Sequence, residues 1–278
     1  MIPASIPVGM YHHVNEHAGD FITVSVANFQ RQMEWLRREG FETLSAESFL
    51  AALHGDYRPA RRCFVITFDD AWLDVYLHAF PVLKKYGHYF IIFAVSDLTD
   101  TASSQPFVVP PGHRFGSHSE AEKLIAQNRV GEVICSWNHL REMQAGGFCS
   151  VENHTASHRN AANLTPEALR DDLLRCRNAI KDQLGRDNLH VCWPKGRHNA
   201  ATLKLARELG FATTHLVRRG VNLRGGRSFA IKRFTVEDRD ETWLKKQVRR
   251  YSNPLAGYLY SRFKPDRWMN KLNQRSGK

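Results

Sequence analysis

The chain has 278 residues, of which 42% are hydrophobic and 24% are charged, a composition typical of one large globular domain with a sizeable core. No apolar stretch in the sequence approaches the length of a membrane-spanning helix, and five cysteines without CxxC spacing favour free thiols over disulfides or a structural zinc site. The formal net charge is +11, and residues 241–278 contribute most of it with ten basic and two acidic residues.

Strand-like and helix-like segments alternate through the first half of the chain. Apolar, β-rich runs predict strands, and apolar residues at helical spacing that end at a glycine predict helices. The expected elements are a strand over 8–14, helices over 26–40 and 45–53, a strand over 63–68, a helix over 73–86 and a strand over 89–96. Residues 97–133 contain three prolines in a polar stretch and are predicted to form an inserted loop.

The second half continues the alternation. The strongest helix is expected over 166–184, because Thr165 suits the N-cap, Pro166 the first turn and Gly185 the stop. The other expected elements are helices over 137–145 and 200–209 and strands over 189–193, 211–217 and 228–235. The alternation predicts an α/β fold with a mostly parallel sheet, and a closed or nearly closed β/α barrel fits better than an open sheet.

The first candidate site follows the strand over 63–68, where residues 67–71 read TFDDA. Active sites of α/β folds lie at the carboxyl ends of strands, and two adjacent carboxylates are costly to bury unless they bind something. Asp69 and Asp70 could supply a metal ligand and a general base. Alternatively, one of them caps the helix that follows.

A pair of histidines forms the second candidate site. His154 and His158 are four residues apart, so they would share one face of a helical turn and could hold one divalent ion. The glutamate that follows the first histidine in zinc proteases is absent, so the base must come from elsewhere, and Asp69 is available. Two histidines and one aspartate leave open positions on a catalytic metal, although the pair could also arise by chance.

TFDD followed by HTASH, with a helix, an apolar strand and a proline-containing turn downstream, resembles the polysaccharide deacetylases of carbohydrate esterase family 4 over residues 8–236. The resemblance implies a distorted β/α barrel and a metal-dependent amidohydrolase. It assigns Asp69 as the catalytic base and Asp70, His154 and His158 as the ligands of a divalent metal, Zn²⁺ in first place.

Two motifs depart from the family pattern. Residues 192–196 read CWPKG where the family has an arginine and a tyrosine, so Lys195 is expected to donate its backbone N–H to the oxyanion, while the group that orients the base is in doubt. The family's C-terminal acid histidine is missing. The MYHHV sequence at residues 10–14 resembles the permuted poly-N-acetylglucosamine deacetylase branch, and it makes His12, rather than His13, the expected general acid.

The resemblance implies that the substrate is an N-acetylhexosamine in a glycan. Residues 1–236 would form the catalytic domain and residues 237–278 a basic, aromatic helical segment. Interleaved aromatic and basic residues suit contact with an anionic membrane through 241–278, or packing on the barrel. The start of the chain lacks signal-peptide features, so we expect a cytoplasmic protein, peripheral at the inner membrane, that acts on a lipid-linked precursor such as a lipopolysaccharide intermediate.

Three other functions fit parts of the sequence. The missing arginine and C-terminal histidine would suit a glycan-binding module that has lost catalysis. The same site could also deacylate a small amide that is not a sugar. Charge alone would suit nucleic-acid binding, but the chain contains no recognised nucleic-acid-binding module and no nucleic-acid partner is expected.

Overall fold

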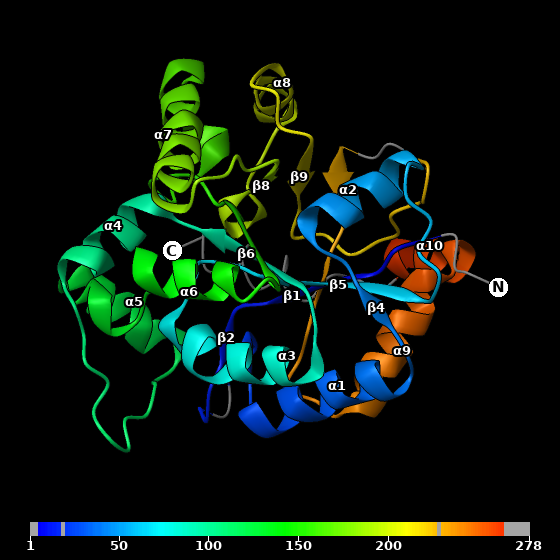
Figure 1. Cartoon of the computed structure of the whole chain (residues 1–278). Coiled ribbons are helices and arrows are strands. Elements are labelled where there is room, and N and C mark those ends of the chain that lie inside the picture. The colour runs from blue at the N-terminus through cyan, green and yellow to red at the C-terminus, as the bar shows by residue number, and fades with distance from the viewer. Residues whose placement is uncertain (1–4, 18–19, 227–228, 264–278) are drawn as a thin grey trace.

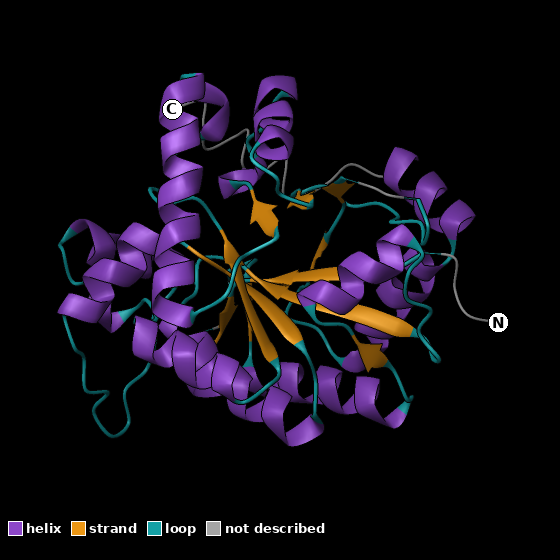
Figure 2. Cartoon of the chain, turned by 45° about the horizontal axis from the view of Figure 1, so that its top comes forward, coloured by secondary structure: helices purple, strands orange, loops and turns teal. Residues whose placement is uncertain are grey.

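A nine-stranded parallel sheet lies at the centre of the protein, with helices around it (Figures 1 and 2). The computed structural model describes residues 5–17, 20–226 and 229–263. The strand order is β10-β9-β8-β7-β6-β5-β1-β11, with β4 paired to β5, and β2 pairs separately with β3. The strands are β1 (Val8–Tyr11), β2 (His13–Val14), β3 (Thr23–Val24), β4 (Glu42–Thr43), β5 (Cys63–Phe68), β6 (Phe90–Ala94), β7 (Cys149–Asn153), β8 (His190–Cys192), β9 (Thr213–His215), β10 (Ala230–Ile231) and β11 (Phe234–Thr235).

The two end strands of this order are neighbours in the sequence. Only Lys232 and Arg233 separate β10 from β11, although β10 pairs with β9 and β11 pairs with β1 at the other end of the sheet. The sheet therefore curls into a distorted half-barrel, which confirms the predicted fold class. The single strand predicted over 228–235 is wrong, because the chain crosses from one end of the sheet to the other at Arg233; Ser228 lies outside the described residues.

The helices follow the capping signals of the sequence. They are α1 (Val26–Arg38), α2 (Ala46–His54), α3 (Phe80–Tyr86), α4 (Ser96–Ser104), α5 (His118–Ala126), α6 (Trp137–Ala145), α7 (Pro166–Leu184), α8 (Ala200–Glu208), α9 (Glu241–Ser252) and α10 (Pro254–Phe263). In α7 the Thr165 side chain accepts from the Ala168 amide, and Gly185 ends the helix in the left-handed region. Residues 75–79, at the start of the helix predicted over 73–86, form a π-helical turn.

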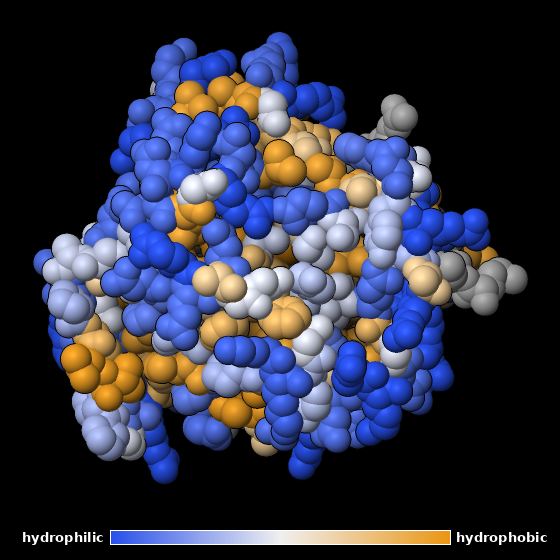
Figure 3. Space-filling model, in the orientation of Figure 1, coloured by the Kyte–Doolittle hydropathy of each residue, from blue (hydrophilic) through white to orange (hydrophobic). Residues whose placement is uncertain are grey.

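The loop predicted over 97–133 is wrong in its secondary structure. The segment contains helices α4 and α5, and the prolines are confined to the connection between them. A capping box starts α5: the Ser117 side chain accepts from the Glu120 amide, and the Glu120 carboxylate accepts from the Ser117 amide. Figure 3 shows hydrophobic side chains gathered where α5 and the preceding connection lie, and Val108 of that connection is 86% exposed.

The described part of the basic C-terminal segment consists of a packed helix, α9, and a more exposed helix, α10. On α9, Leu244, Val248 and Tyr251 are buried in the main core, and the Tyr251 ring stacks on Phe234 of β11 with 5.1 Å between centroids. On α10, four apolar side chains are exposed: Leu255, Tyr258, Leu259 and Phe263. Trp268, another aromatic residue of this segment, lies outside the described residues. No helix within the described ranges is both long and apolar enough to cross a membrane.

Two histidines lie inside the barrel without contact to solvent. His190 of β8 and His215 of β9 are fully buried, with His190 Nδ1 3.1 Å from His215 Nε2 and 2.6 Å from Thr213 Oγ1. Burial lowers the pKa of His190 to about 4. Burial also lowers the pKa of His215 well below its usual value, and His190 and Arg233 add to the effect.

Because burial disfavours protonation of these two histidines, we predict that the folded protein loses stability on acidification. In the unfolded chain both histidines take up protons near pH ~6.5. In the folded protein His190 stays neutral until about pH 4, and the pKa of His215 is lowered as well. The free energy of unfolding should therefore fall as the pH drops from ~6.5 towards 4, by up to ~1.4 kcal/mol per pH unit per histidine. Urea unfolding between pH 6.5 and 5 should show a shallower fall for His190→Gln than for the wild type. The exposed control His54→Gln should keep the wild-type slope, and equal slopes in all three proteins would contradict this account.

Candidate active site

The carboxyl ends of the parallel strands meet at one rim and bring the candidate residues together. His12 follows β1, Asp69 and Asp70 follow β5, His154 follows β7 and Lys195 lies just after β8. All of them, together with His158, line one pocket of about 830 Å³. The residues predicted from two separate motifs are therefore neighbours in space.

Asp70, His154 and His158 form a compact group. Asp70 Oδ1 is 3.1 Å from His154 Nε2 and 3.0 Å from His158 Nε2. Burial would raise the pKa of Asp70, but His158 and His154 lower it well below its usual range, so the carboxylate is ionised. The expected helical turn is absent, since residues 154–160 form a loop and Thr155 and His158 have positive φ angles.

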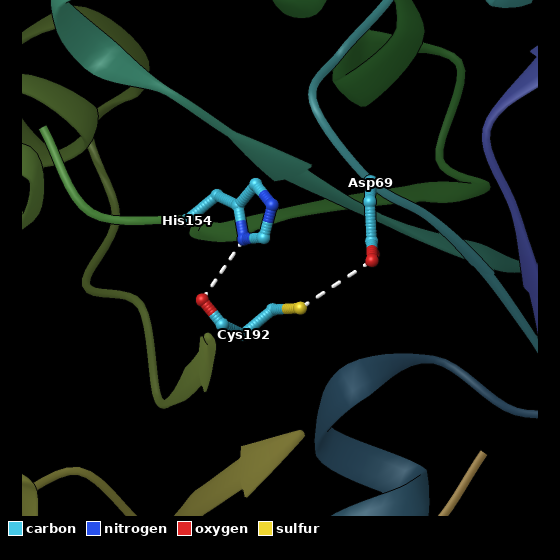
Figure 4. A group of neighbouring side chains, drawn as sticks. All are labelled: Asp69, His154 and Cys192. Carbon is cyan, nitrogen blue, oxygen red and sulfur yellow. Dashed lines mark hydrogen bonds between the residues drawn. The ribbon is translucent and has the colours of Figure 1, made fainter. Parts of the chain in front are cut away.

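Neighbouring residues fix the orientation of Asp70 and His154. Trp72 Nε1 donates to Asp70 Oδ2 at 3.0 Å and leaves Oδ1 facing the histidines. His154 Nδ1 lies 2.9 Å from the backbone carbonyl oxygen of Cys192 and donates to it (Figure 4). The other ring nitrogen, Nε2, faces Asp70. Metal-ligating histidines commonly donate their second ring nitrogen to such a carbonyl.

This donor set fits a divalent metal. In neutral His154 the Nε2 lone pair faces a carboxylate oxygen, and none of the described residues donates a hydrogen bond to that Asp70 Oδ1 atom. A cation between these atoms would satisfy both lone pairs, and ligands at ~2.0–2.1 Å around tetrahedral zinc lie ~3.3 Å apart, close to the distances here. Asp69, His154 and Cys192 form a second group whose ligand atoms lie close to one another. This group fits a metal less well, because both oxygens of Asp69 accept from Arg233 and burial raises the pKa of the Cys192 thiol.

The sequence motifs did not identify the arginine that holds Asp69. Arg233 is fully buried, and its Nη1 and Nη2 lie 2.6 and 2.7 Å from the two carboxylate oxygens of Asp69. Arg233 Nη2 also lies 3.0 Å from the Cys192 sulfur, whose thiol is directed at Asp69 (Figure 4). Burial would raise the pKa of Asp69, but Arg233 lowers it below its usual value, so Asp69 is ionised. Neither Asp69 nor Asp70 caps the following helix, which starts after Asp74.

The two histidines after β1 point to different partners. His12 lines the pocket, with Nε2 3.9 Å from Asp69 Oδ2, and burial lowers its pKa to about 4 although Asp69 acts in the opposite direction. His13 lies 2.8 Å from Asp74 Oδ2 and stacks on Trp72. Of the two, His12 is therefore the one placed beside Asp69.

Backbone strain is concentrated around the pocket. Six described residues other than glycine have positive φ, and five of them, all except Asn128, belong to the site loops: Asp70, Ala71, Thr155, His158 and Lys195. Lys195 has φ 55° and ψ 17°, and its side chain is exposed at the pocket wall beside Pro194 and Arg197. Such conformations cost ~1–3 kcal/mol each and persist where the surrounding structure holds them, often at functional sites.

A family model for polysaccharide deacetylases matches residues 56–214, more than half of the chain and the region that contains Asp69, Asp70, His154, His158 and Lys195. The chain belongs to the polysaccharide deacetylase family. It is a carbohydrate deacetylase of carbohydrate esterase family 4, a hydrolase that acts on amide bonds, as the motifs predicted.

Individual relatives agree with this assignment. The Bacillus subtilis (strain 168) protein YxkH, which is named for the same family, is 27% identical over 84% of this chain and 72% of its own length. The poly-beta-1,6-N-acetyl-D-glucosamine N-deacetylase of Escherichia coli (strain K12) is 23% identical over 72% of this chain, which spans only 32% of that protein. The deacetylase PplD of Streptococcus pyogenes, solved with acetate, shares the fold with a TM-score of 0.73 and 21% identity, covering 88% of this chain and 99% of its own.

The Arg233–Asp69 pair gives a testable prediction. Arg233→Lys keeps one positive charge but loses the two parallel hydrogen bonds, so we expect deacetylation to fall more than tenfold while the protein still folds. Arg233→Met leaves a buried carboxylate without its partner and should cost ~3–5 kcal/mol of unfolding free energy in urea. The control Arg129→Lys alters an exposed ion pair in which Arg129 makes the same kind of two parallel hydrogen bonds, to Glu132, and it should change both quantities little. Wild-type activity in Arg233→Lys would show that the pair does not serve the reaction.

Proposed function

We propose that the protein is a metal-dependent N-deacetylase that removes acetyl from an N-acetylhexosamine in a glycan or a lipid-linked glycan precursor, such as a lipopolysaccharide intermediate. The observation that carries this proposal is the placement of an ionised Asp69 beside the Asp70–His154–His158 group in one pocket. Membership of the deacetylase family and the name of the Escherichia coli relative support the reaction and the sugar class.

In this proposal Asp70, His154 and His158 hold a divalent metal, with Zn²⁺ as the first choice. The metal would act as a Lewis acid toward the amide carbonyl and the attacking water. Its ligands must be deprotonated to bind it, so the metal and protons compete for His154. The Cys192 carbonyl favours the metal-binding tautomer by accepting the Nδ1 proton.

Asp69, His12 and Lys195 would carry the rest of the reaction. Asp69, oriented by Arg233, takes a proton from the water that attacks the amide carbon. The Lys195 backbone N–H donates to the oxyanion. His12 protonates the amine as the C–N bond breaks. Because burial keeps the pKa of His12 near 4, it would receive this proton from Asp69, whose oxygen lies 3.9 Å away, during each turnover.

The test of this function is acetate release from N-acetylhexosamine glycans, free and lipid-linked, with and without a chelator. We expect release from at least one glycan, its loss on chelation and its recovery with added Zn²⁺. A small N-acetylated amide without a sugar serves as the comparison substrate. Faster turnover of that amide would favour the non-sugar alternative, whereas glycan binding without any release would favour a module that has lost catalysis.

We further propose that α10 and the residues after it bring the protein to an anionic membrane surface. The exposed side chains Leu255, Tyr258 and Leu259 follow helical spacing, and residues 254–278 contain six basic residues and one acidic residue. Since α9 belongs to the core, the proposed contact is narrower than the predicted range 241–278. This contact would suit a peripheral protein at the inner face of a membrane.

Flotation with lipid vesicles tests the membrane contact. The full chain should float with vesicles that contain phosphatidylglycerol and stay behind with pure phosphatidylcholine. Leu255→Gln combined with Leu259→Gln should abolish flotation without lowering acetate release from a soluble glycan. The matched control Leu203→Gln alters a half-buried leucine on α8 and should float normally. Equal flotation of all variants would contradict the contact.

A further inference from the structure

A chain of hydrogen-bonding side chains that the proposed reaction does not use runs from the core to the pocket wall. His13 Nδ1 lies 2.8 Å from Asp74 Oδ2, and His13 Nε2 lies 3.2 Å from His118 Nδ1. Asp74 Oδ2 also accepts from the Asn15 amide at 2.7 Å. His13 and Asp74 are buried, whereas His118 lines the pocket.

The chemistry of this chain sets the direction of its hydrogen bonds. The Asp74 carboxylate can only accept, so His13 Nδ1 carries a proton. Burial would lower the pKa of His13, but Asp74 raises it above its usual value, which favours a second proton on Nε2. His13 Nε2 then donates to His118 Nδ1, and the carboxylate oxygen of Glu122, 3.5 Å from His118 Nε2, favours a proton on that nitrogen.

His118 is held rigidly at the start of α5. Its backbone N–H donates to Asp20 Oδ2 at 2.9 Å, and its ring meets Trp72 edge-on with 5.4 Å between centroids. His118 Nε2 lies 3.5 Å from Glu122 Oε1, one turn further along α5. This distance is long for a direct hydrogen bond. A donor, His118, and an acceptor, Glu122, therefore lie next to each other in the pocket lining, which also includes the apolar side chain of Ile125.

We propose that His118 and Glu122 form a subsite for one hydroxyl group of the glycan substrate. The hydroxyl oxygen accepts from His118 Nε2–H, and the hydroxyl proton is donated to Glu122. A phosphate or carboxylate would be repelled by Glu122, and an ammonium group would find no acceptor on His118. A neutral hydroxyl can accept from His118 and donate to Glu122, so this pair suits a sugar hydroxyl. This inference rests on the proposed function, because it places the sugar in the pocket that contains Asp69.

Steady-state kinetics with N-acetylglucosamine tetramers tests the subsite. His118→Phe keeps a flat ring against Trp72 but removes the donor, so we expect KM to rise about tenfold with kcat changed less than threefold. His118→Gln retains an amide donor and should restore KM to within about threefold of wild type. Lys123→Gln, an exposed position on α5 that does not line the pocket, should match the wild type. Unchanged KM in His118→Phe would overturn the subsite.

A binding measurement separates this inference from the proposed reaction. Calorimetry with the metal-loaded Asp69→Asn protein and the same tetramers requires no turnover. Binding that weakens about tenfold in Asp69→Asn/His118→Phe supports the subsite even if the wild type releases no acetate. If the wild type releases acetate but Asp69→Asn and Asp69→Asn/His118→Phe bind the tetramers equally well, the proposed reaction is supported and the subsite is overturned. If the Asp69→Asn protein does not bind the tetramers, the subsite is overturned as well.

The role of Asp74 as a positioning residue can be tested separately, through the tautomer of His118. Asp74→Asn keeps the shape of the side chain but removes the charge that favours a protonated His13. Nitrogen NMR of labelled histidines should show His118 protonated at Nε2 in the wild type and a mixture of tautomers in Asp74→Asn. An identical His118 spectrum in both proteins would contradict the proposed origin of the donor.

Discussion

The buried ion pair between Arg233 and Asp69 links the closure of the sheet to its chemistry. Arg233 lies at the crossing between β10 and β11, the two ends of the strand order, and it reaches across the barrel to the end of β5. Two buried charges are stable in such a place only with good geometry, and here both oxygens of Asp69 are paired. The curl of the sheet therefore positions the carboxylate that we propose as the base.

Two of the three proposed metal ligands are each oriented by a neighbouring hydrogen-bond partner. Trp72 holds Asp70 by one oxygen, and the Cys192 carbonyl holds His154 by one nitrogen. Trp72 also lies between Asp70 and the His13–His118 pair, so the metal-ligand group and the α5 wall share one indole ring. Because Trp72 contacts both groups, it fixes the distance between the proposed sugar subsite and the place where the amide would react.

Local signals predicted much of the fold. Helices α6 and α7 begin and end at the predicted residues, because their caps and glycine stops lie within a few residues of the helix. The TFDD and HTASH motifs identified four residues that the structure brings into one pocket. Their adjacency follows from a general property of parallel sheets, in which the strands end at the same rim.

Long-range pairing could not be read from the sequence. Arg233 is a charged residue in a predicted strand and would need a partner if buried, as Asp69 and Asp70 would. Its partner, Asp69, lies 164 residues away in the chain, so the sequence did not identify the pair. His118 was missed because proline and glycine around it predicted a loop, whereas the capping box at Ser117 starts a helix there. The positive φ angles that shape the His154–His158 loop have no signature in residues other than glycine.

The most direct test compares Asp69→Asn with Asp70→Asn for metal content and acetate release. The proposed roles predict that Asp69→Asn retains bound metal in the wild-type amount yet loses nearly all turnover, while Asp70→Asn loses the metal as well. Elemental analysis of the purified proteins and an acetate assay provide both quantities. Near-wild-type turnover in Asp69→Asn, or full metal content in Asp70→Asn, would contradict the assignment of base and ligand on which the account depends.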